Sequence, residues 1–289
     1  MRTYTIAWEN HRLELGRRTC VMGIINVTPD SFSDGGRYTQ LDAAIAHAEK
    51  LIEDGADILD IGGESTRPFS KPLSAEEELR RVIPVLNTLA GRVSIPISID
   101  TWKSKVAEEA LNSGASMIND IGGLCRDSNM VSVAAAHDVP VIAMHMKGTP
   151  QTMQRNPVYG DLITEIRSFL KHTIDVAQTH GIRKSCIIID PGIGFGKTVS
   201  HNLSILRNLS EFEVLDAPIL VGPSRKSFIR HILEAETGIS LAPDAPRVET
   251  GTQAVIAAAV LNGAHIIRVH DAGTARTIVN IVDKIKKPD

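Results

Sequence analysis

The sequence predicts an α/β fold in which eight strand–helix units close into a (β/α)8 TIM barrel, preceded by a short N-terminal hairpin. From residue 20 onward, short apolar runs alternate with patterns of helical period, eight of each. The 289 residues are 43% hydrophobic, which is enough for one large core. An open doubly wound sheet is the alternative, but its usual Gly-x-Gly-x-x-Gly turn does not follow the first apolar run.

Two short alternating segments within residues 1–19 predict the hairpin, which would cap one end of a single barrel domain spanning residues 20–289. The expected strands are Cys20–Ile25, Ile58–Ile61, Ile97–Ile99, Met117–Ile118, Val139–Met144, Cys186–Ile189, Ile219–Val221 and Ile266–Val269. The expected helices are Asp42–Asp54, Ser74–Leu89, Ser104–Ser113, Asn129–His137, Asp161–His180, His201–Leu209, Thr250–Asn262 and Thr274–Ile285.

Composition excludes several classes of function. The net charge is -3, and the one basic run lies in the tail, so nothing indicates a nucleic-acid surface. No apolar run reaches the roughly 18 residues that a membrane span needs, and no apolar signal core follows the N-terminus. Cys20, Cys125 and Cys186 lie in or beside apolar runs, which is typical of reduced thiols. We therefore expect a cytoplasmic protein.

Polar residues follow the predicted strands at the end where a barrel carries its active site. They are Asn26, Glu64–Arg67, Asp100, Asn119, Asp120, His145, Asp190, Ser224–Lys226, Arg268 and His270. Simpler explanations exist for single members: the aspartates after the third and fourth strands could be helix N-caps, the histidine could be structural, and the adjacent basic residues could be a solvated pair. The convergence of eight strand ends favours a functional site.

The mixture of side chains suits a flat, nitrogen-rich ring. Asp100, Asn119 and Asp190 offer acceptors and an amide to ring N–H groups, and Lys226 offers a donor to a ring carbonyl. The guanidinium of Arg268 can stack on such a ring or bind a phosphate.

A diphosphate could be held by Asn26, Thr66, Arg268 and His270, together with Mg²⁺, which keeps several waters and needs few protein ligands. The loop from Asn26 to Gly36 is rich in the oxygens that a hard cation prefers, although a plain surface turn is the simpler explanation. No Cys/His cluster indicates zinc, and no nucleophile elbow is present.

Five segments of the sequence carry a family resemblance, namely Asn26–Gly36, Gly62–Pro68, Asp190–Lys197, Gly222–Ser227 and Arg268–Asp271. They resemble the signature segments of the dihydropteroate synthase family, and the resemblance extends over about residues 20 to 285. The resemblance implies an enzyme of folate biosynthesis that joins 6-hydroxymethyl-7,8-dihydropterin diphosphate to 4-aminobenzoate, giving 7,8-dihydropteroate and diphosphate.

The resemblance also implies residue roles. Asp100, Asn119, Asp190 and Lys226 correspond to the pterin-binding set, and Thr66, Arg268 and His270 to the diphosphate contacts. Asn26 corresponds to the magnesium ligand. Asp190, Lys226, Arg268 and His270 would be catalytic, and Arg67, Pro68, Phe195 and Ser224 would shape the aminobenzoate pocket. The family is commonly homodimeric, which makes the Thr250–Asn262 helix a candidate interface.

One departure from the family pattern is Phe69, which stands where a small residue usually follows Arg-Pro. We expect it to alter the entrance to the aminobenzoate pocket, and hence sulfonamide sensitivity.

Three alternative functions are considered for the sequence: a pterin-binding corrinoid methyltransferase, a catalytically inactive barrel, and a phosphate-binding aldolase. The diphosphate loop argues against the methyltransferase, and the intact strand ends argue against an inactive barrel. No lysine within a predicted strand is placed to form a Schiff base, which argues against the aldolase.

Overall fold

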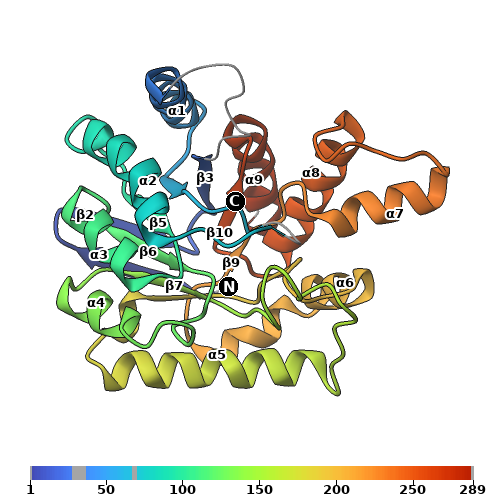
Figure 1. The fold of residues 1–289 in the computed structure, drawn as a ribbon. Helices are drawn as coiled ribbons and strands as arrows, with labels where there is room; N and C mark the ends of the chain where they lie inside the picture. Colours follow the sequence, from blue (N-terminus) through green and yellow to red (C-terminus); the bar gives the residue numbers. More distant parts are fainter. Residues whose placement is uncertain (1, 28–36, 67–69, 288–289) are drawn as a thin grey trace.

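The computed structural model describes residues 2–27, 37–66 and 70–287, and within them it has the predicted barrel architecture (Figure 1). Its parallel strands pair in the order β8-β7-β6-β5-β4-β3-β10-β9. They are β3 (Cys20–Asn26), β4 (Ile58–Gly62), β5 (Ile97–Asp100), β6 (Met117–Asp120), β7 (Val141–Met144), β8 (Ile187–Asp190), β9 (Leu220–Val221) and β10 (Ile266–Val269).

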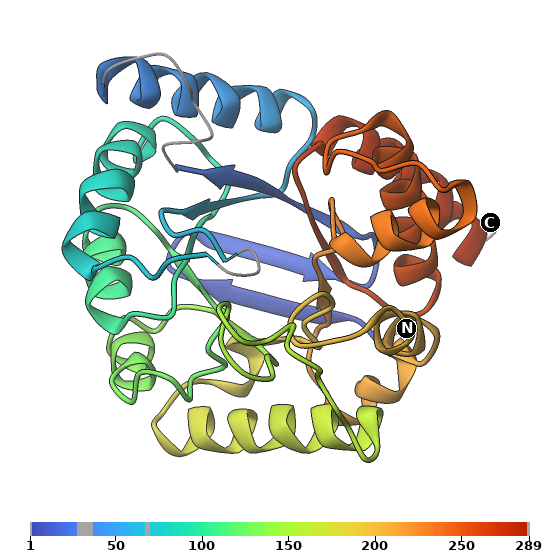
Figure 2. The same ribbon diagram turned by 45° about the vertical axis from the view of Figure 1, so that its right-hand side comes forward.

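The two outer strands of that order meet and close the barrel. Ile189 in β8 forms a parallel bridge with Ile219, and its N–H donates to the Pro218 carbonyl at 2.9 Å. The central strands are buried along their whole length, as in β4 and β5, because helices cover their outer face (Figure 2). The closed barrel confirms the predicted fold class.

The helices on the outside match the predicted ones to within a few residues, with one exception. They are α1 (Arg37–Glu53), α2 (Ala75–Leu89), α3 (Ser104–Asn112), α4 (Met130–Ala136), α5 (Leu162–Thr179), α6 (Val199–Arg207), α7 (Ser227–Thr237), α8 (Pro246–Leu261) and α9 (Ala272–Lys286). The exception is α7, which is not among the helices predicted from the sequence. Phe228 and Ile229 are the buried residues of this helix, which ends at Gly238, a residue with left-handed backbone angles.

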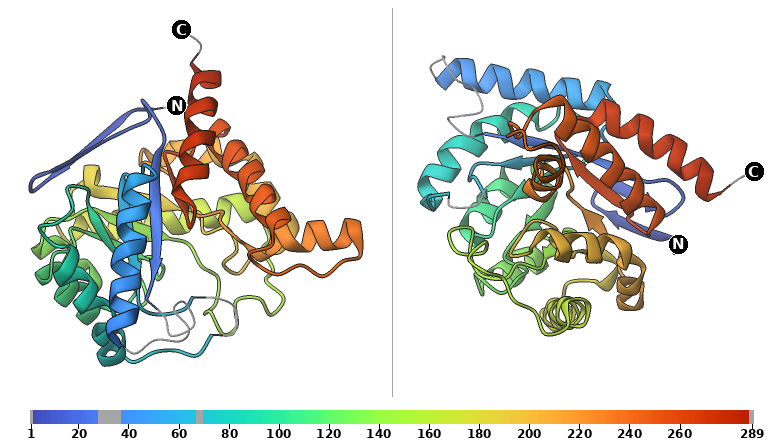
Figure 3. Two further views of the ribbon diagram at one scale, coloured as in Figure 1. Left: turned by 90° about the horizontal axis from the view of Figure 1, so that it is seen from above. Right: turned by 90° about the vertical axis from the view of Figure 1, so that its right-hand side faces the viewer.

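The N-terminal hairpin is present as predicted. β1 (Tyr4–Trp8) pairs antiparallel with β2 (His11–Leu15), and alternate residues such as Ile6 are buried in the same apolar core as the barrel. The hairpin lies at the end of the barrel where the parallel strands begin (Figure 3). There the Tyr4 ring meets His265, just before β10, edge to face with centroids 5.2 Å apart. The opposite end of the barrel is left for the site.

A membrane-crossing role finds no support among the described helices, since each of them is too short or too polar to span a bilayer.

Candidate active site

Strand register brings the predicted polar residues to one level of the barrel. Asn26 in β3 pairs with Gly62, Gly62 pairs with Asp100, and Asp100 pairs with Asn119. Since parallel strands in register end together, their terminal side chains form a ring at the C-terminal mouth. Asp190 ends β8 on the far side of the barrel and pairs with Met144.

The floor of this ring is an ion-pair cluster centred on Arg268. Its Nε donates to Oδ2 of Asp60 at 2.5 Å, and its Nη2 donates to Oδ2 of Asp100 at 2.6 Å. The Nδ2 of Asn119 also donates to Oδ2 of Asp60, at 3.0 Å. Asp60 is completely buried. One guanidinium and one amide therefore fix two carboxylates within the barrel.

Two oxygens of this cluster remain as acceptors. Oδ1 of Asp60 and Oδ1 of Asp100 are buried and have no hydrogen-bond partner among the described residues. A buried carboxylate oxygen without a donor costs free energy, so such atoms call for an explanation. A ligand carrying several N–H groups would satisfy them.

Asp60 is not among the site residues predicted from the sequence. The available signal was an acid inside the apolar run from Ile58 to Ile61, where a charge is unfavourable unless it is paired. The prediction rests on residues that follow the strands, whereas Asp60 lies inside β4, two residues before its end.

Burial also perturbs the carboxylate of Asp190. Desolvation raises its pKa from 3.8 to about 6, although the Gly192 N–H donates to Oδ1 at 2.7 Å and Lys226 lies nearby. Because burial disfavours the ionised form, the Asp190 carboxylate lowers the free energy of unfolding by about 3 kcal/mol at neutral pH. Desolvation likewise raises the pKa of Asp100, against the opposing effect of Arg268. N–H donors of a bound ligand would offset part of the desolvation free energy of these two carboxylates.

Lys226 supplies a cation on the same side as Asp190. Desolvation, followed by the like charge of Arg268, lowers its pKa to about 8. Its Nζ lies 3.9 Å from the ring centroid of Phe195, a cation–π contact. Phe195 belongs to a small apolar cluster with Ile121, Met144 and Met153, separate from the main core. The site thus pairs an amine donor with an apolar wall.

The glycines after β8 allow this packing. Gly192 and Gly194 both have positive φ. A Cβ on Gly192 would lie 1.9 Å from the His145 carbonyl oxygen, and one on Gly194 would lie 2.7 Å from Cδ of Lys226. The loop therefore approaches both neighbours more closely than any other residue would permit.

A second group of side-chain contacts lies at the rim of the C-terminal mouth. The Nδ1 of His270 is 2.9 Å from Oγ of Ser224, and its Nε2 is 3.5 Å from Nδ2 of Asn26. The imidazole of His270 is thus held between the Ser224 hydroxyl and the Asn26 amide. Ser224 is buried, whereas Asn26 and His270 are partly exposed and line the mouth. Thr66 is also partly exposed, four residues beyond the end of β4.

His145 is the structural histidine that the sequence left as an alternative. Its ring packs edge to face on Phe169, with centroids 5.0 Å apart, and its Nδ1 lies 3.0 Å from Nζ of Lys197. Burial lowers its pKa to about 3. Lys197, a residue outside the predicted site, is 2% exposed and also donates to the Phe195 carbonyl at 3.0 Å. It supports the loop that carries Phe195.

Two other strand-end residues have structural roles. Asp120 accepts from the N–H groups of Gly122 and Leu124, so it shapes its own turn. Arg225 has a φ of 56° and donates to Glu249 on α8 at 2.5 Å, so it is not half of a solvated pair. Of the predicted aminobenzoate set, Arg67 and Pro68 lie outside the described residues, as does Phe69.

The side chains of the described residues limit how the predicted magnesium ion could be held. Within residues 2–27, 37–66 and 70–287, no three His, Cys, Asp or Glu side chains gather to hold a metal ion. A cation caged by such side chains therefore does not fit this part of the chain. Asn26 offers an amide oxygen at the rim, which fits a Mg²⁺ that binds mainly through water and substrate phosphates.

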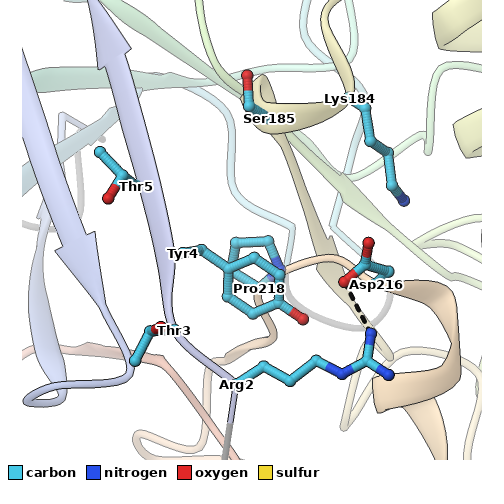
Figure 4. Close-up of a pocket in the computed structure, with 8 residues that line it drawn as sticks. All are labelled: Arg2, Thr3, Tyr4, Thr5, Lys184, Ser185, Asp216 and Pro218. Carbon is cyan, nitrogen blue, oxygen red and sulfur yellow. Dashed lines mark hydrogen bonds and ion pairs between the residues drawn. The ribbon is translucent and has the colours of Figure 1, made fainter.

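A cavity of about 720 Å³ lies away from these residues (Figure 4). It is bordered by the start of the hairpin, by the segment before β8 and by Pro218 before β9, and so it lies where the strands begin. Its Arg2 and Asp216 form an ion pair at 2.8 Å with both side chains more than half exposed. Such a pair is worth little, and the cavity has none of the buried acceptors described above.

Comparison with known proteins agrees with this geometry. Residues 22–270 match the family model described as pterin binding enzyme. That match defines the class of the protein as a pterin-binding barrel.

Individual relatives narrow the class. The dihydropteroate synthase of Synechocystis sp. is 47% identical over 270 residues, covering 93% of this chain and 91% of the relative. A Clostridium difficile dihydropteroate synthase structure in the presence of pteroic acid is 44% identical, with a TM-score of 0.86 and coverage of 94% and 98%. The Xanthomonas albilineans enzyme with 4-aminobenzoic acid is 42% identical, with a TM-score of 0.86 and 96% coverage of both chains. The chain belongs to the dihydropteroate synthase family.

The glycine loop gives a direct test of the site geometry. Gly194→Ala should lower the free energy of unfolding by about 2 kcal/mol or more, because a φ of +85° disfavours Ala and its Cβ would collide with Lys226. Gly160→Ala is the matched control, since the nearest atom to its Cβ is 3.5 Å away. Urea unfolding followed by circular dichroism measures both. Equal stability of Gly194→Ala and wild type would contradict the packing described.

Proposed function

We propose that this chain condenses 6-hydroxymethyl-7,8-dihydropterin diphosphate with 4-aminobenzoate to give 7,8-dihydropteroate and diphosphate. The observation that carries the proposal is the cluster of Asp60, Asp100 and Arg268, in which one buried oxygen of each carboxylate has no partner among the described residues. Lys226 lies close enough to Arg268, Asp190 and Asp100 for their charges to shift its pKa. Family membership supports the same reaction.

The pterin ring would lie within the ring of strand ends. Its amino and ring N–H groups match carboxylate acceptors on Asp100 and Asp190, and its carbonyl matches the Lys226 ammonium. Asn119 is held by Asp60, so its amide is already oriented for a ligand. Fixed partners of this kind lower the entropy cost of binding.

The diphosphate would extend toward the rim, near Asn26, Thr66 and His270. Two of the five N–H groups of Arg268 are engaged by carboxylates, so its main role is to organise the floor and to carry positive charge. Mg²⁺ bound through Asn26 and the phosphates would neutralise charge on the leaving group.

Loss of diphosphate leaves positive charge on the pterin methylene, delocalised into the ring. The carboxylates of Asp100 and Asp190 would stabilise that charge in a dry, preorganised site. The aromatic amine would then attack from the side of Phe195 and Ser224 and release a proton. No covalent intermediate with the protein is needed, so the chain acts through positioning and electrostatics.

A homodimer remains our expectation from the family. Support comes from apolar side chains exposed at one end of α8 and along α9, namely Leu261, Ile281 and Ile285, which are 52%, 61% and 63% exposed. A cytoplasmic location likewise stays a prediction.

The direct test is diphosphate release from the dihydropterin diphosphate with Mg²⁺, with and without 4-aminobenzoate, and with mass identification of the product. Aminobenzoate-dependent release with dihydropteroate formed is expected. Asp190→Asn should lower kcat/KM at least about 100-fold, because it removes a buried charge from the site. The exposed Asp175→Asn should match wild type. Absence of aminobenzoate-dependent release from the folded protein would refute the proposal.

Pterin affinity should also depend on pH. The pKa of Asp190 is about 6 in the unbound protein, and ring N–H donors bind the ionised form. Affinity for 6-hydroxymethyl-7,8-dihydropterin should therefore fall about tenfold per unit below pH 6. It should also fall toward pH 8, because Lys226, with a pKa of about 8, begins to lose the ammonium proton that it offers to the ring carbonyl. Isothermal titration between pH 8 and pH 5 measures this. Asp190→Asn should show a shallower fall at acid pH, because only Asp100 then still titrates as a ring acceptor. A constant affinity over that range would show that the carboxylate does not bind the ring.

A further inference from the structure

A buried ionic triad outside the site described above joins the segment after β4 to the barrel. Lys103, just before α3, donates to Oε2 of Glu78 on α2 at 2.5 Å and also to Oε2 of Glu64. The side chains of Lys103, Glu64 and Glu78 are only 10%, 10% and 0% exposed. Lys103 and Glu78 are not among the predicted site residues, and Glu64 was predicted only as part of the polar segment after the second strand, with no role of its own.

Stability alone explains this triad poorly. A buried ion pair rarely stabilises a fold more than apolar residues of the same volume would, because desolvation offsets the attraction. Burial raises the pKa of Glu78, and its Oε1 has no partner among the described residues. The same two helices are already joined at the surface by Lys105 and Glu76, at 2.9 Å. What the buried triad adds is Glu64.

Glu64 holds its segment at two points. Its Oε2 accepts from Lys103, while its Oε1 accepts from the Leu73 N–H at 3.2 Å, nine residues along the chain. The preceding residue, Gly63, is also fixed: its carbonyl accepts from Arg81 on α2 at 3.0 Å, and a Cβ there would lie 2.9 Å from Val82. The segment leaving β4 is therefore pressed onto α2 and tied to the start of α3.

Thr66 lies two residues beyond Glu64, at the rim where we propose that the diphosphate binds. Lys103 follows Asp100, on the floor of the site, by three residues. The triad thus fixes the backbone two residues before Thr66, and its hydrogen bonds do not involve Asp100, whose described partner is Arg268.

We infer that Lys103, acting through Glu64, is a positioning residue that sets Thr66 for the diphosphate end of the substrate. The inference rests on the proposed function. Residues on the strands, Asp100 and Asn119, hold the ring independently of this segment. Loss of the triad should therefore weaken binding of the diphosphorylated pterin and leave binding of the bare pterin unchanged.

Two variants test this, Lys103→Met and Glu64→Ala, with Lys105→Met as the matched control from the exposed pair. Isothermal titration compares 6-hydroxymethyl-7,8-dihydropterin with its diphosphate, in the presence of Mg²⁺. Both variants should weaken diphosphate-ester binding about tenfold or more, as expected when a contact residue is misplaced, with bare-pterin affinity within twofold of wild type. Lys105→Met should match wild type for both ligands.

Unchanged affinity for both ligands in folded variants would overturn the inference, and so would an equal loss for both ligands. If Lys103→Met fails to fold because it leaves two buried carboxylates unpaired, Glu64→Ala decides, since it preserves the Lys103–Glu78 pair. Failure of the proposed function would look different, because wild type itself would then bind the two pterins equally or form no dihydropteroate.

Discussion

The site depends on one arrangement, the Arg268 guanidinium held between the carboxylates of Asp60 and Asp100. Two buried carboxylates that share one guanidinium would repel each other without that cation between them. The guanidinium satisfies one oxygen of each and leaves the other oxygen without a partner. Asn119 is oriented by the same Asp60. Removing any member of this cluster would change the positions of the others.

The arrangement is costly to the unbound protein. Burial raises the pKa of Asp100 and Asp190 and lowers that of Lys226 to about 8, all of which disfavour the charged forms. The glycine loop after β8 adds backbone with positive φ. Such a site is preorganised for a polar ring and for charge that develops on it, at the expense of stability. The rest of the barrel, with its continuous apolar core, supplies that stability.

Much of this could be predicted from the sequence because strand ends in a barrel converge by geometry. Asp100, Asn119 and Asp190 were predicted from their place after apolar runs. Asp60 was missed because it lies inside such a run, where a side chain's direction cannot be known without the register. Helix α7 was missed because it follows directly on a loop motif. Arg268 was assigned to stacking or phosphate binding, since its carboxylate partners lie 208 and 168 residues away in the chain.

Asp60 organises the floor of the proposed pterin site although it lies within a strand. Isothermal titration of 6-hydroxymethyl-7,8-dihydropterin into Asp60→Asn tests it most directly, with the exposed Asp138→Asn as control. We predict a loss of affinity of about 100-fold, because Arg268 and Asn119 lose their shared anionic acceptor, in a protein whose circular dichroism spectrum is unchanged. Wild-type affinity in the folded Asp60→Asn variant would contradict the account.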